Sequence, residues 1–537
     1  MKGCDALVTV LLLMAAIVII LSVIVSRLAS RLKVPMLLGF IFLGLFVGND
    51  ASLGPVFSDF ALTESICTAA LVIVMFDGGF QTRWKAAKKA ALPAGILATA
   101  GVLTTAALTG LFCHYALGMP WLTALLTGSL ISSTDAASVF SILRNQKLAL
   151  RDHTDSLLEL ESGSNDPVSY LLVTVILTMM QTTVTWLDIL WILLCQIGIG
   201  LLAGWLISRF ALWFLSKVQL EFSGFLTVFV LACALMAYAG STLLAGNGYL
   251  AVYLAGLILG NSRLRHKKEL VPFFDGLSTL MQMTIFFILG LLADPDSILA
   301  VLPLSFGIFL FLTLVARPAA VFLCLSGFRS SLAKKLVVSA AGLRGAASIV
   351  FAIMARMTVP GLGQDVFHIV FGVVLFSISL QGTLLPWIAR RLHMSDESGN
   401  VLKTFSDYGA EPDLQFSLLE LGSESGWAGK TLAELALPPG MATALVIRDG
   451  ERIIPEGGTL LQKQDRLVIT TQPYHSARNL LDSEVLDGDD PRIGKSLAEI
   501  ASRPIVCISR HERMLIPDGT TLLQEGDTLV FVQKNAL

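Results

Sequence analysis

Long apolar stretches separated by short polar connections run through the first 395 residues of this chain, and they limit its possible folds more than any other feature. A helix needs about 20 mostly apolar residues to cross a bilayer. Thirteen such stretches lie near residues 6–26, 35–49, 61–77, 91–117, 121–143, 156–181, 185–208, 222–240, 247–261, 276–293, 298–326, 333–356 and 365–389. Those at 35–49 and 247–261 are short, so they could be tilted or re-entrant. The sequence predicts a multispan α-helical membrane protein with about 13 transmembrane helices.

Lysine and arginine alternate between the connections. The odd-numbered connections and the segment after the last span hold 21 basic residues, whereas the even-numbered connections and the N-terminus hold only Lys2 and Arg356. Cytoplasmic loops are enriched in Lys and Arg. The pattern therefore predicts a multi-pass protein of the bacterial inner (plasma) membrane, with its N-terminus outside and its C-terminal domain in the cytoplasm.

The charge balance divides the chain at about residue 395. Residues 1–395 carry a net charge of +7 and residues 396–537 a net charge of −9, within a chain that is 54% hydrophobic and 15% charged. With a mean hydropathy of +0.74, this composition excludes a disordered chain, a nucleic-acid-binding protein and a simple soluble enzyme. The seven cysteines are scattered singly, so we expect neither a disulfide framework nor a zinc site.

Several ionisable residues fall inside or at the edge of the predicted spans, where a charge is costly and so indicates function. They are Asp77, Asp135, Glu161, Asp166, Arg317 and Arg344. In the sixth span, Glu161 and Asn165 are four residues apart, as are Ser162 and Asp166, which places all four in one sector of a helix. Their oxygen atoms suit a hard cation, although the same groups could form a hydrogen-bond cluster between packed helices.

The fifth and twelfth spans each combine small residues with an ionisable one. Thr134 and Asp135 end the run Ser-Ser-Thr-Asp in the fifth span, and two glycines flank Arg344 in the twelfth. Such runs predict broken helices, and their separation by seven spans fits two inverted repeats with a site near the bilayer midplane. Small-residue packing or an arginine that extends to the interface are the alternatives. A buried Arg344 needs a carboxylate partner, for which we expect Glu161.

Asp77 and Arg317 have less specific surroundings. Asp77 ends the third span in front of two glycines, so it is either a site residue or a solvated cap. Arg317 precedes Pro318 in the eleventh span, where an accessory structural charge fits better than direct contact with a ligand.

Residues 396–537 contain an internal repeat. The run Gly429–Leu435 recurs as Gly494–Ile500, and the run Ile454–Gln462 recurs as Ile516–Gln524. Two copies of one small α+β module are therefore expected, which divides the chain into a transmembrane domain at 1–395, a first module at 396–475 and a second at 476–537. Each module should hold a short helix, at Lys430–Leu435 and at Lys495–Ile500, followed by alternating strands. A soluble module on a transporter indicates regulation, with passive folding or dimerisation as the alternative.

With these residues in view, positions 5–392 resemble the NhaP-type monovalent cation:proton antiporters. The resemblance rests on Phe76-Asp77-Gly78-Gly79, Thr134-Asp135, Glu161-Ser162, Asn165-Asp166 and Gly342-Leu343-Arg344-Gly345. It implies a homodimer, and it implies a cation on Asp166 with Ser162, Thr134 and Asp135 around it and Asp77 nearby. It also implies a structural ion pair between Glu161 and Arg344, and electroneutral exchange from the Asn165-Asp166 pair.

The tail modules resemble RCK-C (TrkA-C) regulatory domains. Such domains imply a possible regulatory nucleotide or cyclic dinucleotide, while no other cofactor is expected. Within the family they imply exchange of K⁺ for H⁺, as in cell-volume regulators, although the residues leave Na⁺ open. We therefore expect a secondary antiporter, not an enzyme, in which a proton and a cation compete for Asp166. A cation channel or uniporter gated by the tail, and a membrane sensor that no longer transports, are the alternatives.

Overall fold

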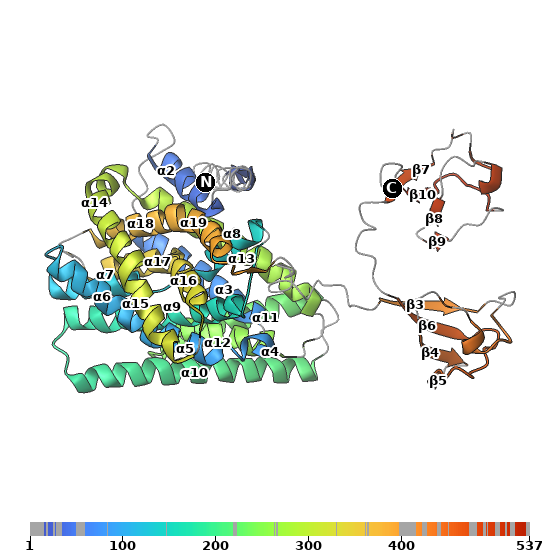
Figure 1. The fold of residues 1–537 in the computed structure, drawn as a ribbon, viewed down its shortest axis with the longest axis horizontal. Coiled ribbons are helices and arrows are strands. Elements are labelled where there is room, and N and C mark those ends of the chain that lie inside the picture. The colour runs from blue at the N-terminus through green and yellow to red at the C-terminus, as the bar shows by residue number, and fades with distance from the viewer. Residues whose placement is uncertain are drawn as a thin grey trace, which may run out of the picture. The chain divides into compact units, whose positions relative to one another are not determined.

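The computed structural model divides the chain into two compact units, Met1–Gly409 and Ala410–Leu537. The structure describes residues 35–49 and 59–396, apart from positions 83, 147, 219–222, 263, 265–266, 329, 360 and 362–364. It also describes a few residues between 16 and 27, and the strands and turns of the tail between 415 and 532. The first unit is almost entirely helical, and the second consists of two small sheets (Figure 1).

The helices of the first unit follow one another with short connections. The first half holds α2 (Met36–Asn49), α3 (Phe60–Gln81), α4 (Trp84–Ala87), α5 (Ala91–Ile96), the π-helical turn η1 (Leu97–Gly101), α6 (Val102–Tyr115), α7 (Trp121–Leu130), α8 (Ala136–Asn145), α9 (Thr154–Gln181) and α10 (Trp186–Lys217). The second half holds α11 (Ser223–Leu243), α12 (Gly248–Gly260), α13 (Lys267–Leu292), α14 (Pro295–Phe311), the π-helical turn η2 (Leu312–Ala316), α15 (Arg317–Leu325), the 3₁₀ turn η3 (Ser326–Phe328), α16 (Leu332–Ala340), α17 (Ala346–Thr358), α18 (Val366–Phe376), the π-helical turn η4 (Ser377–Gln381) and α19 (Gly382–Arg391).

Many of these helices begin at a residue that caps the free backbone N–H groups of the first turn. The side chains of Asp59, Thr185, Asn247, Asp294 and Ser331 each accept a hydrogen bond from the backbone N–H three residues further on. Short polar N-caps of this kind stabilise a helix start. These capping residues fix where α3, α10, α12, α14 and α16 begin, whereas α13 begins at Lys267, nine residues before the predicted span at 276–293.

Helices occupy every predicted span from the second to the thirteenth. Among the described residues, seven helices are long and apolar enough to cross a membrane, and further apolar helices of 10–17 residues accompany them. The predicted first span at 6–26 lies mostly outside the described residues. The chain is thus a multispan helical membrane protein.

Two of the spans are interrupted, as the small-residue runs predict. The fifth span is divided into α7 and α8 by the unwound segment 131–135, and the twelfth is divided into α16 and α17 by the unwound segment 341–345. The π-helical turns η1 and η2 lie in the fourth and eleventh spans, which are also seven apart. Matching irregularities at this interval support two related halves.

The tail unit holds two four-stranded antiparallel sheets of equal topology. The first has strand order β3-β6-β4-β5 and the second β7-β10-β8-β9. Their strands are β3 (Gln415–Glu420), β4 (Ala442–Arg448), β5 (Glu451–Ile453) and β6 (Arg466–Thr471), then β7 (Leu481–Val485), β8 (Ile505–Arg510), β9 (Arg513–Leu515) and β10 (Thr528–Val532). The equal order agrees with the predicted repeat.

One prediction for the tail was wrong. The expected helices at Lys430–Leu435 and Lys495–Ile500 are single 3₁₀ turns at Leu432–Glu434 and Leu497–Glu499. Bridges of the flanking residues to the sheet, Thr431 with Leu460 and Ser496 with Leu522, take up the backbone groups that a longer helix would need.

An ion pair inside each sheet repeats as well. Arg448 donates from Nε and Nη2 to the buried carboxylate of Asp465, at 2.8 and 2.7 Å. Arg510 donates in the same way to Asp527, at 2.7 and 2.6 Å. The hydrogen bond from the Arg448 guanidinium holds the pKa of Asp465 below its usual range.

Candidate ion-binding site

The two unwound segments meet in the interior of the helical unit. The backbone N–H of Asp135 donates to the carbonyl of Leu343 at 2.8 Å, and the hydroxyls of Ser133 and Ser348 lie 3.5 Å apart. Unwound backbone at membrane depth is tolerated only where such partners replace the missing helical bonds. The crossing therefore fixes the ends of four half-helices around one point.

Arg344 stabilises this crossing through the backbone. Its Nη1 donates to the carbonyls of Ser132 and Ser133 at 2.6 and 2.7 Å, just beyond the C-terminal end of α7. A positive charge at a helix C-terminus is favourable, because that end carries unsatisfied carbonyls and a partial negative charge. At the other break, Gln381 donates to the carbonyl of Ala340 at 2.8 Å, so a neutral amide caps the end of α16.

Asp135 lies at the start of α8, where it acts as the N-cap. Its carboxylate accepts from the Ser138 backbone N–H at 3.1 Å and from the Ser138 hydroxyl at 2.5 Å. Gly345 leaves the space for it, because a Cβ at that position would lie 2.0 Å from Asp135 Oδ2. The glycine that the sequence marks as a helix breaker thus also allows close approach of a carboxylate.

Asp166 faces the same point from α9. It is buried, and Ser133 and Asp135 line the same small cavity as Asp166. Both carboxylates, together with Thr134, line a cavity of about 40 Å³ at the crossing. One water needs at least about 10–15 Å³ measured in this way. The cavity can therefore hold one monovalent cation with little or no hydration.

Ser162 and Asn165 hold the unwound segment in place from α9. The Ser162 hydroxyl donates to the carbonyl of Thr134 at 2.5 Å, and the Asn165 amide donates to the hydroxyl of Thr134 at 2.6 Å. Both side chains are buried. The structure thus brings together Thr134, Asp135, Ser162, Asn165 and Asp166, as the sequence predicts, with Ser162 and Asn165 bonded to Thr134.

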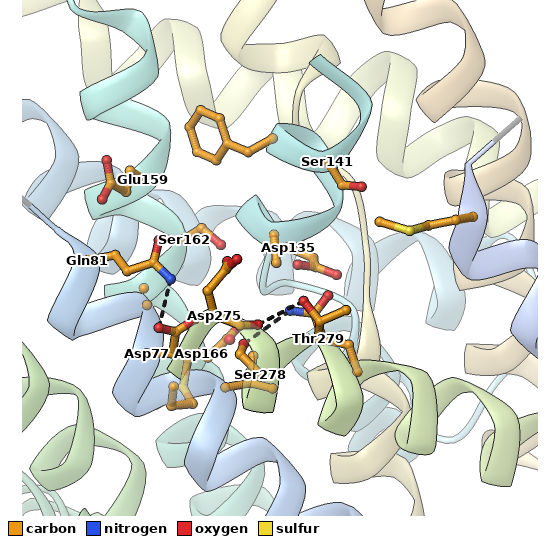
Figure 2. A pocket seen from close by; sticks show the side chains of 18 residues that line it. Asp77, Gln81, Asp135, Ser141, Glu159, Ser162, Asp166, Asp275, Ser278 and Thr279 are labelled. Atoms are coloured by element: carbon orange, nitrogen blue, oxygen red, sulfur yellow. Dashed lines mark hydrogen bonds between the residues drawn. The ribbon is translucent and has the colours of Figure 1, made fainter. Parts of the chain in front are cut away.

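A larger cavity of about 280 Å³ leads to this point, and its wall includes Asp77, Asp135 and Asp166 (Figure 2). Asp77 is buried on α3 and accepts a hydrogen bond from Gln81 at 2.7 Å. Glu159 on α9 and Asp275 on α13 line the same wall. The cavity is acidic, and a wall of one sign of charge concentrates cations.

The position of Asp77 follows from close helix packing. A Cβ at Gly79 would lie 2.3 Å from the Tyr253 carbonyl oxygen, and a Cβ at Gly256 would lie 2.3 Å from that of Phe76. Small residues let the backbones of α3 and α12 approach closely. Gly79 therefore packs α3 against α12, and Asp77 belongs to the cavity instead of capping a solvated end.

The expected partner of Glu161 was wrong. Arg317, not Arg344, contacts it, with Arg317 Nη1 at 2.6 Å from Glu161 Oε1 and both side chains at most 2% exposed. The Arg344 guanidinium donates to the backbone carbonyls of Ser132 and Ser133 instead. Gly342 makes room for Arg317, because a Cβ there would lie 2.7 Å from Arg317 Nε.

The sequence interpretation missed several residues of this region. Ser133 was part of a small-residue run without an assigned role, and Gln81 was not considered. Glu159, inside the predicted span 156–181, and Asp275, just before the span 276–293, were given no role, although both line the cavity. Their charge so near an apolar run was the signal that could have identified them.

Broken helices that cross at a small cavity with two carboxylates, reached through an acidic cavity, define the class of ion-coupled secondary transporters. Residues 16–391 match the family of the sodium/hydrogen exchanger, transmembrane domain, and residues 417–481 match the TrkA-C domain. The chain belongs to the sodium/hydrogen exchanger family. It is a multi-pass cation:proton antiporter and not an enzyme, and it carries a TrkA-C domain.

Proteins of known function agree with this assignment. The chain is 34% identical to the K(+)/H(+) antiporter NhaP2 of Shewanella sp. (strain ANA-3) over 472 residues, which covers 86% of this chain and 81% of the relative. It is 32% identical to the K(+)/H(+) antiporter NhaP of Alkalimonas amylolytica, covering 85% and 80%. It is 26% identical to the Na(+)/H(+) antiporter NhaS2 of Synechocystis sp., covering 71% of each.

The fold agrees with a solved structure. The sodium proton antiporter MjNhaP1 from Methanocaldococcus jannaschii superposes with a TM-score of 0.63 at 23% identity, covering 70% of this chain and 97% of that one. At this identity the likeness concerns the fold alone.

Proposed function

We propose that this protein exchanges K⁺ for H⁺ one for one, by competition of the two ions for the Asp166 carboxylate. The observation that carries this proposal is the cavity of about 40 Å³ between Asp135 and Asp166. A cation in so small a cavity lies beside the carboxylates with little hydration, and a proton on Asp166 removes the negative charge that would hold it, so the two ions compete. Exchange of like charges moves no net charge and needs no other energy source.

The similarity to known antiporters favours K⁺ over Na⁺ as the transported cation. The K(+)/H(+) antiporters that match over 85–86% of this chain, which includes part of its tail, are 32–34% identical, whereas the Na(+)/H(+) antiporter of Synechocystis is 26% identical and matches 71%. In the predicted topology of thirteen spans with the N-terminus outside, the cavity of Asp77 opens toward the cytoplasm. A homodimer in a bacterial plasma membrane remains our expectation.

The test is transport by the purified full chain in liposomes that contain a pH-sensitive dye. We expect outward gradients of K⁺ to drive proton uptake, with Na⁺, Rb⁺ and Li⁺ compared at equal concentration. Asp166→Asn should abolish exchange, while Asp188→Asn, which changes an exposed helix cap on α10, should leave it unchanged. Exchange that survives in Asp166→Asn would refute the assignment, and cation current without proton movement would show a channel.

Electroneutrality has its own measurement in the same liposomes. A membrane potential set with valinomycin and a K⁺ gradient would also change the driving force for K⁺ exchange. The potential should therefore be set with a gradient of a permeant anion that carries no protons. We expect the initial rate to be unchanged by the potential. A rate that rises with voltage of one sign would contradict one-for-one exchange.

We also propose that the tail modules, 396–475 and 476–537, regulate exchange, with a nucleotide or cyclic dinucleotide as the candidate ligand. A two-stranded ribbon supports this. Strand β2 (Ser395–Asp396), at the start of the tail, pairs with β1 (Ala149–Leu150) in the connection between α8 and α9. Helix α8 begins directly after Asp135, and α9 contains Asp166, so a displacement of β2 would move the segment that joins the two site helices.

Two variants separate this regulation from transport itself. Removal of residues 397–537 keeps the ribbon and should change the rate or the pH profile of exchange. Asp396→Pro removes the N–H that a strand ladder needs, and it should reproduce that change in the full chain. An unchanged rate and pH profile in both variants would refute the regulatory role of the tail.

A further inference from the structure

A second cavity, of about 380 Å³, lies at the other end of α3 from Asp77. Its wall combines the carboxylate of Glu64 and the hydroxyls of Ser65 and Thr68 with aromatic residues of other helices. Three tyrosines contribute: Tyr170 of α9, Tyr238 of α11 and Tyr249 of α12. The ion site described above uses none of these residues.

The position of this cavity follows from helix geometry on α3 and α9. Glu64 precedes Asp77 by thirteen residues, which is about 20 Å along a helix axis. Tyr170 follows Asp166 by four residues, so it lies on the same face of α9 one turn further from Glu159. The second cavity is thus the next layer beyond Asp166, on the side away from the first cavity.

The residues of α17 also show that the second cavity lies one helical turn beyond the small cavity at the crossing. Ala346 and Ala347 line the small cavity at the crossing, and Val350 and Phe351, four residues later, line the second cavity. Three helices that run through the ion site therefore reach this cavity next.

Three aromatic rings in the wall of the second cavity pack against one another, and one of them, Tyr170, lies one helical turn from Asp166. Tyr170 and Tyr249 lie with ring centroids 5.0 Å apart, and Phe351 lies 5.6 Å from Tyr170 and 5.5 Å from Tyr249. Rings at these distances pack in ordinary van der Waals contact. The second cavity shares no lining residue with the small cavity at the crossing, whereas the first cavity shares Asp135 and Asp166 with it.

We propose that the second cavity is the vestibule of the transport path on the opposite membrane face, and that Glu64 binds a hydrated monovalent cation there. This rests on the proposed function, since a transporter that alternates between two faces needs a route on each. A carboxylate with hydroxyl oxygens suits a hard cation. The vestibule measures about 380 Å³ and the small cavity about 40 Å³, so the vestibule leaves room for several waters around the ion.

The difference in size gives the two sites different tasks. The vestibule holds a cation that keeps most of its hydration, so its affinity is low and it concentrates ions. The small cavity at Asp166 takes the dehydrated ion, and access to it from this face requires the rings of Tyr170, Tyr249 and Phe351 to separate.

The first test is the sidedness of two cysteine variants of the full chain. Ser65→Cys places a thiol at an exposed position of the vestibule, and Thr279→Cys places one at an exposed position of the first cavity. We expect a membrane-impermeant thiol reagent to modify them from opposite faces of oriented vesicles, above the background of the wild-type cysteines. Modification of both from the same face would overturn the proposal.

The second test measures binding by Glu64. Isotonic KCl, compared with choline chloride, should slow modification of Ser65→Cys by about two- to fivefold, which corresponds to one partly exposed ion pair. Glu64→Gln should abolish this protection. The thiol of Thr279→Cys should be modified at the same rate with and without the Glu64→Gln substitution. Protection that persists in Glu64→Gln, or none in wild-type Glu64, would overturn the site. Labelling needs no transport, so its outcome is independent of the flux measurement on Asp166→Asn.

Discussion

Replacing Arg317 by methionine removes the group that contacts Glu161 inside the helical unit. The two side chains are 2% and 1% exposed, and Nη1 lies 2.6 Å from Oε1. At an effective dielectric constant of about 20, unit charges at that distance attract by about 6 kcal/mol. Loss of one partner from such a pair costs about 3–5 kcal/mol, because the other charge stays buried. Attraction from Arg344 offsets part of this cost, so we expect a loss of about 3 kcal/mol.

A double-mutant cycle isolates the pair. Glu161→Gln, Arg317→Met and the double variant should give a coupling energy of about 2–3 kcal/mol. A second cycle with Arg344→Met should give less than about 1 kcal/mol, because the Arg344 guanidinium is bonded to backbone carbonyls and not to Glu161. The measurement is equilibrium unfolding of the purified full chain in mixed micelles. A larger coupling of Glu161 with Arg344 than with Arg317 would refute the assignment of partners.

Other positions give further predictions. Gly345→Ala should lower the rate of exchange by about 10- to 100-fold. The added Cβ would lie 2.0 Å from Asp135 Oδ2, so the carboxylate would have to move. Gly307→Ala, where nothing lies within 4 Å, is the control in the same liposomes, and equal rates for both variants would contradict the close approach. Asp465 has a pKa held low by Arg448, so it stabilises its sheet above about pH 4, and this stabilisation is lost as the pH falls through its lowered value. Asp465→Asn should therefore weaken hydrogen-exchange protection of β3-β6-β4-β5 at pH 7. Asp527→Asn should weaken hydrogen-exchange protection of β7-β10-β8-β9 instead. If either substitution lowers protection in the sheet that does not contain it, the two ion pairs are not equivalent.

The parts of the fold that depend on local chemistry could be predicted from the sequence. Apolar length determines the helical spans, and polar runs beside glycines mark the breaks at 131–135 and 341–345. The residues of the ion site were recognisable because a carboxylate such as Asp166 is too costly inside a membrane to be incidental.

Features that depend on distant partners could not be predicted in this way. Arg317 pairs with Glu161 because Gly342 leaves space for its side chain, and that space is visible only in three dimensions. The bonds of Ser162 and Asn165 to Thr134 depend on the crossing in the same way. In the tail, the bridge of Thr431 to Leu460 limits a predicted helix to one 3₁₀ turn.

The central claim is that one carboxylate binds either a proton or a cation. Proton release on addition of K⁺ to the purified protein in weakly buffered detergent solution tests this most directly, because it needs no membrane and no gradient. We expect wild-type protein to release at most one proton per chain, in a saturable manner, and Asp166→Asn to release none. Equal release from Asp166→Asn, or K⁺ binding by the wild type without any release of protons, would contradict competition at Asp166.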